Sequence, residues 1–284
     1  MRPRLGVHLQ NFSASPDADW SRLVEVAVAA DRSGIGYIVV SDHVLFGERL
    51  DDYANPQLGG VSGGSQPTGP DGAWLEPVAV LAFLAAHTER VRLATHVLLA
   101  ALRRPTVLAK QLATVDVLSG GRLDIGVGVG WQRAEYEASG LDFNRRGELL
   151  DAALDTCTAL WRGAMPGVHQ MPRPVQPDGV PIWISGTDND RVARRLARHG
   201  AGWIPWGRDA ERLGDVLPEL RDRVAAAGGD PAFRVVARAV DSAGLAQAVA
   251  AGATDVTVRL RADTGNVEAE LTAWVTELGE VAPS

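Results

Sequence analysis

Short apolar runs alternate with longer amphipathic stretches along the whole chain, a pattern typical of βα units around a parallel sheet. The apolar runs predict eight strands, at residues 5–10, 37–41, 91–97, 122–129, 181–185, 202–205, 234–239 and 255–259. Helical periodicity follows each of them and predicts helices at residues 20–33, 75–87, 105–118, 145–162, 189–199, 210–227, 242–251 and 267–278. Eight strands, each followed by a helix, predict an α/β fold, the (β/α)8 TIM barrel.

The even spacing of these units indicates a single domain over residues 1–284. A doubly wound open sheet is the competing architecture, but no linker or change in composition divides the chain. One connection is unusually long: residues 42–74, after the second strand, are so rich in Gly, Pro and Ser that we expect no packed element there. Loops that follow barrel strands build the active site, so this segment is either a mobile lid over the substrate or an insertion without a role.

Three glycines alternate along the fourth predicted strand, at Gly126, Gly128 and Gly130. A dinucleotide-binding GxGxxG turn is excluded, because its third glycine would fall at Trp131 or Arg133. We expect one face of this strand to lack side chains and to lie against something flat or bulky. The alternative is that the glycines only relieve crowding where a helix packs on the strand.

Residues at the carboxyl ends of the predicted strands are the catalytic candidates, because barrel enzymes place their chemistry there. The first strand carries His8, the second ends in Asp42-His43, the third contains His96 and the fourth leads to Trp131. A carboxylate beside an imidazole can orient the ring for proton transfer near neutral pH, which makes Asp42-His43 a candidate pair. The same pair is also a common cap for a turn.

A strand that runs into a helix at PIWISGTDND predicts a phosphate site. Backbone N–H groups of Gly186, Thr187 and Asp188 would point outward with the helix dipole behind them. Asp188 and Asp190 oppose an anion there, unless one of them serves as the helix N-cap. We therefore expect a phosphorylated cofactor.

Several classes of function lack support. The formal net charge of -7 without a basic run argues against nucleic-acid binding. No apolar segment is long enough to span a membrane, no leader is evident and Cys157 is the only cysteine, so we expect a protein of the reducing cytoplasm. No GxSxG or GxxxxGK[ST] motif occurs, and the histidines lack metal-binding spacing, although His8, His43 and His96 could still converge.

Taken together, several segments resemble the bacterial luciferase-like superfamily, especially its actinobacterial F420-dependent branch. They are GIGYIVVSDHV, LEPVAVLAFLAAHTERVRLATHVL, RRPTVLAKQLATVDVLSGGRLDIGVGVGW with Glu135, PIWISG and GAGWIPW. The resemblance implies a (β/α)8 barrel with the cofactor ring at its C-terminal mouth. The ring would lie against a bulge in the third strand, often with a non-proline cis peptide, and the phosphate at Gly186 and Thr187.

The resemblance also implies site residues. The catalytic candidates are His43, Asp42 and His96. The expected cofactor-binding residues are His8, Thr95, His96, Val97, Gly128, Gly130, Trp131, Ser185, Gly186 and Thr187. Trp131 and Gly47 depart from the F420-dependent sugar-phosphate dehydrogenases, which carry Glu and Trp at these places, so that reaction is not expected here.

The implied function is hydride transfer between coenzyme F420 and a small organic substrate. The alternative is an FMN-dependent monooxygenase that uses reduced flavin and dioxygen, and a third reading is a non-catalytic flavin-binding protein. A homodimer is expected from the resemblance alone.

Overall fold

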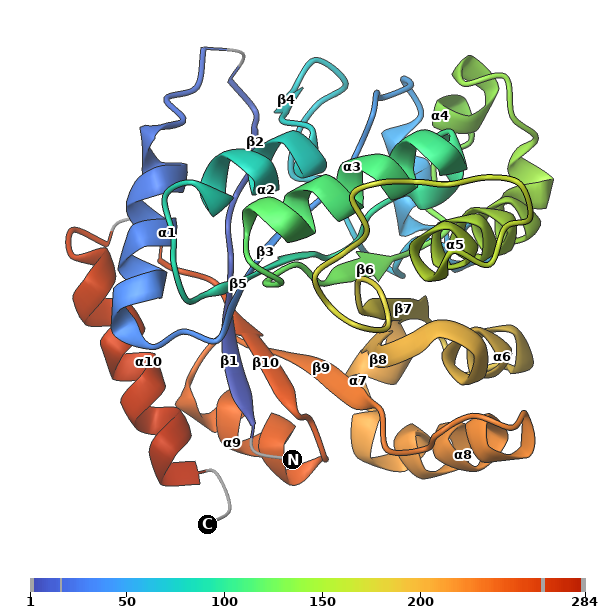
Figure 1. Cartoon of the computed structure of the whole chain (residues 1–284). Helices are drawn as coiled ribbons and strands as arrows, with labels where there is room; N and C mark the ends of the chain where they lie inside the picture. Colours follow the sequence, from blue (N-terminus) through green and yellow to red (C-terminus); the bar gives the residue numbers. More distant parts are fainter. Residues whose placement is uncertain (1–2, 16, 262–263, 282–284) are drawn as a thin grey trace.

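The computed structural model describes residues 3–15, 17–261 and 264–281. Its described part contains a parallel sheet of eight strands: β1 (Arg4–His8), β3 (Tyr37–Val40), β5 (Arg92–Thr95), β6 (Ile125–Val127), β7 (Ile182–Gly186), β8 (Gly200–Pro205), β9 (Arg234–Ala239) and β10 (Asp255–Val258). The strands follow one another in chain order and β10 pairs with β1, so the sheet curls into a nearly closed barrel (Figure 1). The predicted (β/α)8 barrel is confirmed.

Helices surround this barrel (Figure 1). They are α1 (Ser21–Ser33), α2 (Pro77–Ala85), α3 (Pro105–Leu118), α4 (Arg133–Ala138), α5 (Arg146–Arg162), α6 (Asp190–His199), α7 (Arg208–Glu211), α8 (Leu213–Ala226), α9 (Ser242–Ala250) and α10 (Val267–Val281). The single helix predicted at 210–227 is wrong in one respect, because Arg212 leaves helical geometry with φ of -117° and separates α7 from α8. Short 3-10 turns lie at Ala100–Leu102 and Phe143–Arg145.

The connection at residues 42–74 contains ordered elements, contrary to expectation. It forms 3-10 turns at Leu50–Ala54 and Pro56–Leu58, followed by the short strand β4 (Ala73–Trp74). This strand pairs antiparallel with β2 (Phe12–Ser13), and the rings of Phe12 and Trp74 stack with centroids 4.4 Å apart. The buried Asn11 side chain donates hydrogen bonds to the carbonyls of Ser41 and Leu75, so the loop is tied to the exit of β3. Composition alone did not reveal these long-range ties.

The barrel closes irregularly between β5 and β6. Leu93 pairs with Leu123 and Leu98 pairs with Val127. The segment that contains β5 therefore advances five residues while the segment that contains β6 advances four. The extra residue makes a β-bulge at the C-terminal end of β5. The His96–Val97 peptide bond within it is cis, as the resemblance implied.

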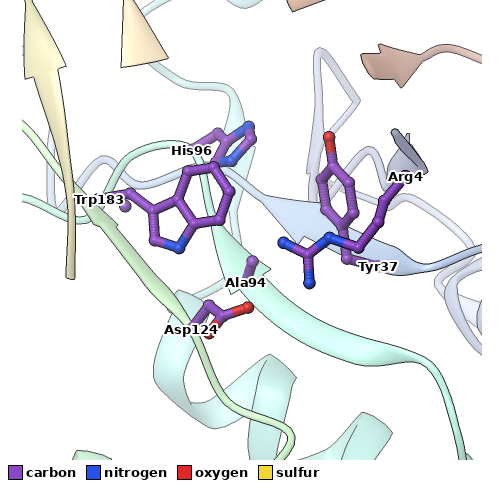
Figure 2. A pocket seen from close by; sticks show the side chains of 7 residues that line it. Arg4, Tyr37, Ala94, His96, Asp124 and Trp183 are labelled. Atoms are coloured by element: carbon purple, nitrogen blue, oxygen red, sulfur yellow. The ribbon is translucent and has the colours of Figure 1, made fainter. Parts of the chain in front are cut away.

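Below this bulge the barrel interior is packed. Figure 2 shows the Arg4 guanidinium pointing between the rings of Tyr37 and Trp183, beneath His96. The Arg4 Cζ atom lies 5.7 Å from the Tyr37 ring centroid and 5.8 Å from that of Trp183, and the cavity left among these side chains is only about 10 Å³. Space for a ligand therefore lies on the C-terminal side of His96.

Candidate active site

A cavity of about 1010 Å³ opens at the C-terminal mouth of the barrel. The strand exits and the 42–74 connection form its walls. Ten of the predicted site residues line it: Asp42, His43, His96, Val97, Gly128, Gly130, Trp131, Ser185, Gly186 and Thr187. Two do not. Thr95 is fully buried and donates a hydrogen bond to the Gly126 carbonyl at 2.8 Å, and the His8 ring hydrogen-bonds to the Ser41 hydroxyl at 2.9 Å.

His43 and Glu135 form a buried pair at the wall of this cavity. The His43 Nδ1 atom lies 3.2 Å from Glu135 Oε1, and the two side chains are 10% and 0% exposed. The same carboxylate oxygen accepts a hydrogen bond from the Val44 amide at 2.8 Å, which fixes it against the exit of β3. Because Nδ1 is engaged, Nε2 is the ring nitrogen left for a ligand, and it has no hydrogen-bond partner among the described residues.

Aromatic rings enclose this histidine. The His43 ring centroid lies 4.5 Å from that of Phe46, 4.9 Å from Trp74 and 5.9 Å from Trp131. Tyr53 packs edge-on against Trp131 with centroids 5.4 Å apart. The Trp131 Nε1 atom is buried without a hydrogen-bond partner in the described chain, although its residue lines the cavity. Around His43 the walls are thus apolar and flat, and the Trp131 Nε1–H is an unused donor.

Asp42, the carboxylate expected to orient His43, is engaged elsewhere. It accepts a hydrogen bond from the Leu99 amide at 2.8 Å and two from the Arg103 guanidinium, at 2.6 and 3.1 Å. Arg103 also donates to Glu76 at 2.8 Å. Asp42 therefore ties the exits of β3 and β5 together, and the orienting carboxylate is Glu135, which lies on α4 after β6.

His96 and His8 are neutral at physiological pH. Burial lowers the pKa of His96 to about 3, and the charge of Arg238 acts in the same direction. Burial also lowers the pKa of His8 to about 3, with Arg259 and Arg238 adding to the effect. A histidine with so low a pKa does not supply a proton as an imidazolium. Among the predicted proton-handling residues, His43 is thus the better placed.

The glycines of β6 accommodate the neighbouring strand. A Cβ atom at Gly126 would lie 2.2 Å from the Thr95 carbonyl oxygen, and one at Gly128 would lie 2.8 Å from Val97 Cγ2. The expected bare face is therefore filled mainly by the β5 bulge, which corrects the view that it is left open for a bulky ligand. Gly128 and Gly130 still contribute backbone to the cavity.

The predicted phosphate end of the cavity lies where β7 meets α6. Gly186 has a φ of 155°, and a Cβ there would collide with Val192. The N-cap of α6 is Asn189 rather than Asp188 or Asp190, and the Asp188 amide donates to the Asp209 carboxylate, so it is not available to an anion. Gly186 and Thr187 remain at the cavity surface.

Two arginines at this end were missed from the sequence. Arg146 and Arg191 both line the cavity next to the β7 exit, and neither forms an ion pair with a carboxylate within the described ranges. Arg146 donates to the Phe143 carbonyl at 3.1 Å, and burial lowers its pKa, with the charge of Arg191 among the further causes. Their positions at the starts of α5 and α6 could have indicated a role, because helix starts face the barrel mouth.

A second pair, Arg238 and Arg259, lines the cavity from the other side of the barrel. These residues lie at the carboxyl end of β9 and just after β10, so the rule for strand ends could have found them as well. The described residues include no cluster of three or more His, Cys, Asp or Glu side chains placed to hold a metal ion. Within the same residues, no helix has the length and apolar character needed to cross a membrane.

Comparison with known proteins places the chain in a family. Residues 4–254 match the profile of the luciferase-like monooxygenase family. An uncharacterised protein of Mycobacterium tuberculosis is 35% identical over 173 residues, which cover 57% of this chain and 61% of that relative. The F420-dependent glucose-6-phosphate dehydrogenase of Nocardia farcinica is 30% identical over 237 residues, 76% of this chain and 63% of that enzyme.

A flavin-dependent relative and an F420-dependent enzyme of known structure are also similar to this chain. The oxygenase component of the flavin-dependent trigonelline monooxygenase of Acinetobacter baylyi is 28% identical over 201 residues, 66% of this chain and 49% of that protein. An F420-dependent secondary alcohol dehydrogenase solved with an F420-acetone adduct shares the fold, with a TM-score of 0.73 at 14% identity over 99% of both chains. The chain therefore belongs to the luciferase-like monooxygenase family, whose members similar to it include both F420-dependent and flavin-dependent enzymes.

Proposed function

We propose that the protein is an oxidoreductase that transfers a hydride between coenzyme F420 and a small organic substrate at the C-terminal mouth of the barrel. The observation that carries this proposal is the His43–Glu135 pair, which opens into a cavity of about 1010 Å³. Reaction at a carbonyl or alcohol transfers both a hydride and a proton, and His43, held by Glu135, can accept or donate that proton. The similarity to an F420-dependent enzyme from Nocardia farcinica supports the choice of cofactor.

The residues present fit a tricyclic cofactor with a phosphate group. Ligand cavities usually measure about 300 to 1,000 Å³, so this one has room for a ring and a substrate together. The Trp131 indole and its neighbours offer flat apolar walls, and its unused Nε1–H can donate to a ring oxygen or nitrogen. Gly186, Thr187, Arg146 and Arg191 would hold the phosphate.

The bound deazaflavin would supply or accept the hydride. The chain's own residues position the substrate and move the proton. His43 Nε2 takes a proton from a substrate hydroxyl during oxidation, or returns one to the carbonyl oxygen during reduction. Glu135 holds the ring by Nδ1 and stabilises the positive charge while the proton resides on it. The rings of Phe46, Trp74 and Trp131 exclude water from this exchange.

An FMN-dependent monooxygenase is the second candidate, favoured by the similarity to the Acinetobacter baylyi oxygenase component. Both functions use the same barrel mouth and phosphate end. A non-catalytic flavin-binding protein has no need of an oriented histidine that faces the cavity, so the His43–Glu135 pair argues against it.

Titration of the purified protein with F420 and with FMN, followed by fluorescence, tests the choice of cofactor. We expect saturable binding of F420 and weaker binding of FMN. Tight binding of FMN without binding of F420 would overturn the leading proposal in favour of the monooxygenase.

The role of His43 is tested by His43→Ala in single-turnover assays with the bound cofactor. Loss of a general acid or base typically lowers the rate by about 10²- to 10⁴-fold, whereas the cofactor Kd should change little. His87→Ala is the matched control, because His87 is exposed just after α2 and its ring hydrogen-bonds to the Phe83 carbonyl, away from the cavity. Turnover equal to that of the control would remove His43 from the mechanism.

A further inference from the structure

Two adjacent strands present arginines to the cavity at a place where neither the phosphate end nor the His43–Glu135 pair uses them. Arg238 pairs in register with Thr257 of the neighbouring β10, and Arg259 follows at the exit of that strand. Both side chains are exposed and both line the cavity. The two guanidinium groups therefore share one sector of the barrel mouth.

Among the described residues, neither guanidinium has a carboxylate partner. The side chains of Arg238 and Arg259 form no ion pair and no hydrogen bond with them. The opposite end of the same strands behaves differently, because Arg4 and Arg234 both pair with the buried Asp255, at 2.7 and 2.6 Å. Strand arginines of this barrel are thus neutralised at its closed end and left unneutralised at its open end.

The charges of Arg238 and Arg259 shift the pKa values of neighbouring groups. Enclosure by the cavity walls and the nearby charge of Arg259 both lower the pKa of Arg238. Both arginines also lower the pKa of His8, and Arg238 lowers that of His96. Two like charges on neighbouring strands repel each other, and an anion between them would remove that penalty. The planar, always charged guanidinium is the side chain best suited to bind carboxylate or phosphate oxygens.

This sector is separate from the phosphate end. Gly186 ends β7 and Arg191 lies at the start of α6, whereas Arg238 lies on β9 and Arg259 directly follows β10. Between them, after β8, α7 lines the cavity with Arg208, Asp209 and Glu211. Two carboxylates and one guanidinium therefore lie between the two basic sectors, which belong to different strands, and one phosphate group does not serve both.

We propose that Arg238 and Arg259 bind an oxyanion, a carboxylate or a phosphate, carried by the organic substrate. This rests on the proposed function and adds to it a substrate class, a small anionic alcohol or carbonyl compound. The oxyanion is held at β9 and β10 while the reacting carbon extends toward His43. Tyr53, from the 42–74 connection, also lines the cavity; burial raises the pKa of its hydroxyl, and the charges of Arg238 and Arg259 oppose that rise.

The test compares three probes of similar size, benzoate, phenyl phosphate and benzamide, by calorimetric titration of protein saturated with its cofactor. We expect at least one of the two anions to bind about tenfold more tightly than neutral benzamide, as charge-assisted hydrogen bonds require. In Arg238→Gln/Arg259→Gln this preference should fall below about threefold, while the cofactor Kd stays within about twofold. The control is Arg261→Gln/Arg212→Gln, which removes the same charge from exposed arginines that pair with Glu270 and Asp215.

Two further measurements keep the outcomes distinct. In wild-type protein, raising NaCl from about 50 to 500 mM should weaken anion binding and leave benzamide binding unchanged. The titrations are repeated on cofactor-free protein with Arg191→Gln as a comparison, so that they report on the arginines even if neither F420 nor FMN binds. Absence of a preference for the anions, a preference that survives in the double variant, or loss of cofactor affinity in that variant would each overturn the proposal.

Discussion

At the scale of single residues, the orientation of His43 depends on one partner, Glu135, that lies 92 residues away in the chain. We expect Glu135→Gln to lower turnover about tenfold or more, because the neutral amide no longer stabilises a proton on the imidazole. The Val44 amide can still donate to the remaining oxygen, so the loop should keep its place. The measurement is kcat together with the cofactor Kd, and the Kd should stay within about twofold.

Glu137→Gln is the matched control for that substitution. Glu137 lies on the same helix, its side chain is 63% exposed and its only ion pair is with Arg133 at 3.9 Å among the described residues. Removing its charge should leave turnover unchanged. Equal losses in the two variants, or an equal rise in cofactor Kd, would show that Glu135 acts only through the stability of α4.

The candidate histidine could be predicted from the sequence, but its partner could not. Position after a strand identifies His43, because every strand exit of a barrel faces the same mouth. The neighbouring Asp42 is the obvious carboxylate in the sequence, yet consecutive residues of an extended strand exit point in opposite directions. Asp42 therefore turns to Leu99 and Arg103, and only the closed barrel brings Glu135 to the imidazole.

At the scale of elements, the glycines of β6 and the bulge of β5 fit one another. A Cβ at Gly128 would meet the Val97 side chain at 2.8 Å, so Gly128→Ala should lower the free energy of unfolding by about 1 to 2 kcal/mol through overpacking. In a Val97→Ala background the same substitution should lower it by less than about 0.5 kcal/mol, because the methyl groups that collide are gone. Chemical denaturation of the wild type, the two single variants and the double variant measures the coupling free energy between Gly128 and Val97.

Gly279→Ala on α10 serves as a control for that cycle, since no atom outside the helix lies within 4 Å of the position. It should be neutral or stabilising, as alanine is the better helix former. If the effects of Gly128→Ala and Val97→Ala on the free energy of unfolding are additive, the bulge does not occupy the space above Gly128. That face of β6 would then be open to a flat ligand.

The order of elements was predictable from hydrophobic periodicity, whereas the local irregularities were not. Periodicity reports which residues are buried, so all eight strands were found within a few residues of their true bounds. It does not report which neighbour buries them, so the pattern predicts a ligand beside Gly126, where the Thr95 carbonyl and the side chains of Ile204 and His96 lie instead. The order within residues 42–74 likewise depends on Asn11, whose bonds to the loop span 30 and 64 residues.

At the scale of the whole molecule, the neutral histidines inside the barrel make stability depend on pH. Burial lowers the pKa of both His8 and His96 from 6.5 to about 3 in the folded protein, whereas the unfolded chain titrates near 6.5. Below pH 6.5 the unfolded chain therefore binds protons at these two histidines that the folded protein does not bind. The stabilisation is complete above pH 6.5 and is lost progressively as the pH falls toward 3.

Between pH 7.5 and 5.5, each of these histidines should lower the free energy of unfolding by about 1.4 kcal/mol. The measurement is urea denaturation of the cofactor-free protein at both pH values, for the wild type, His8→Gln, His96→Gln and the exposed control His87→Gln. Burial lowers the pKa of His199 as well, so the wild type should lose further stability that all variants share. Each barrel variant should recover about 1.4 kcal/mol of the loss and the control none. A pH dependence equal to that of the wild type in both barrel variants would show that these rings are protonated within the folded barrel.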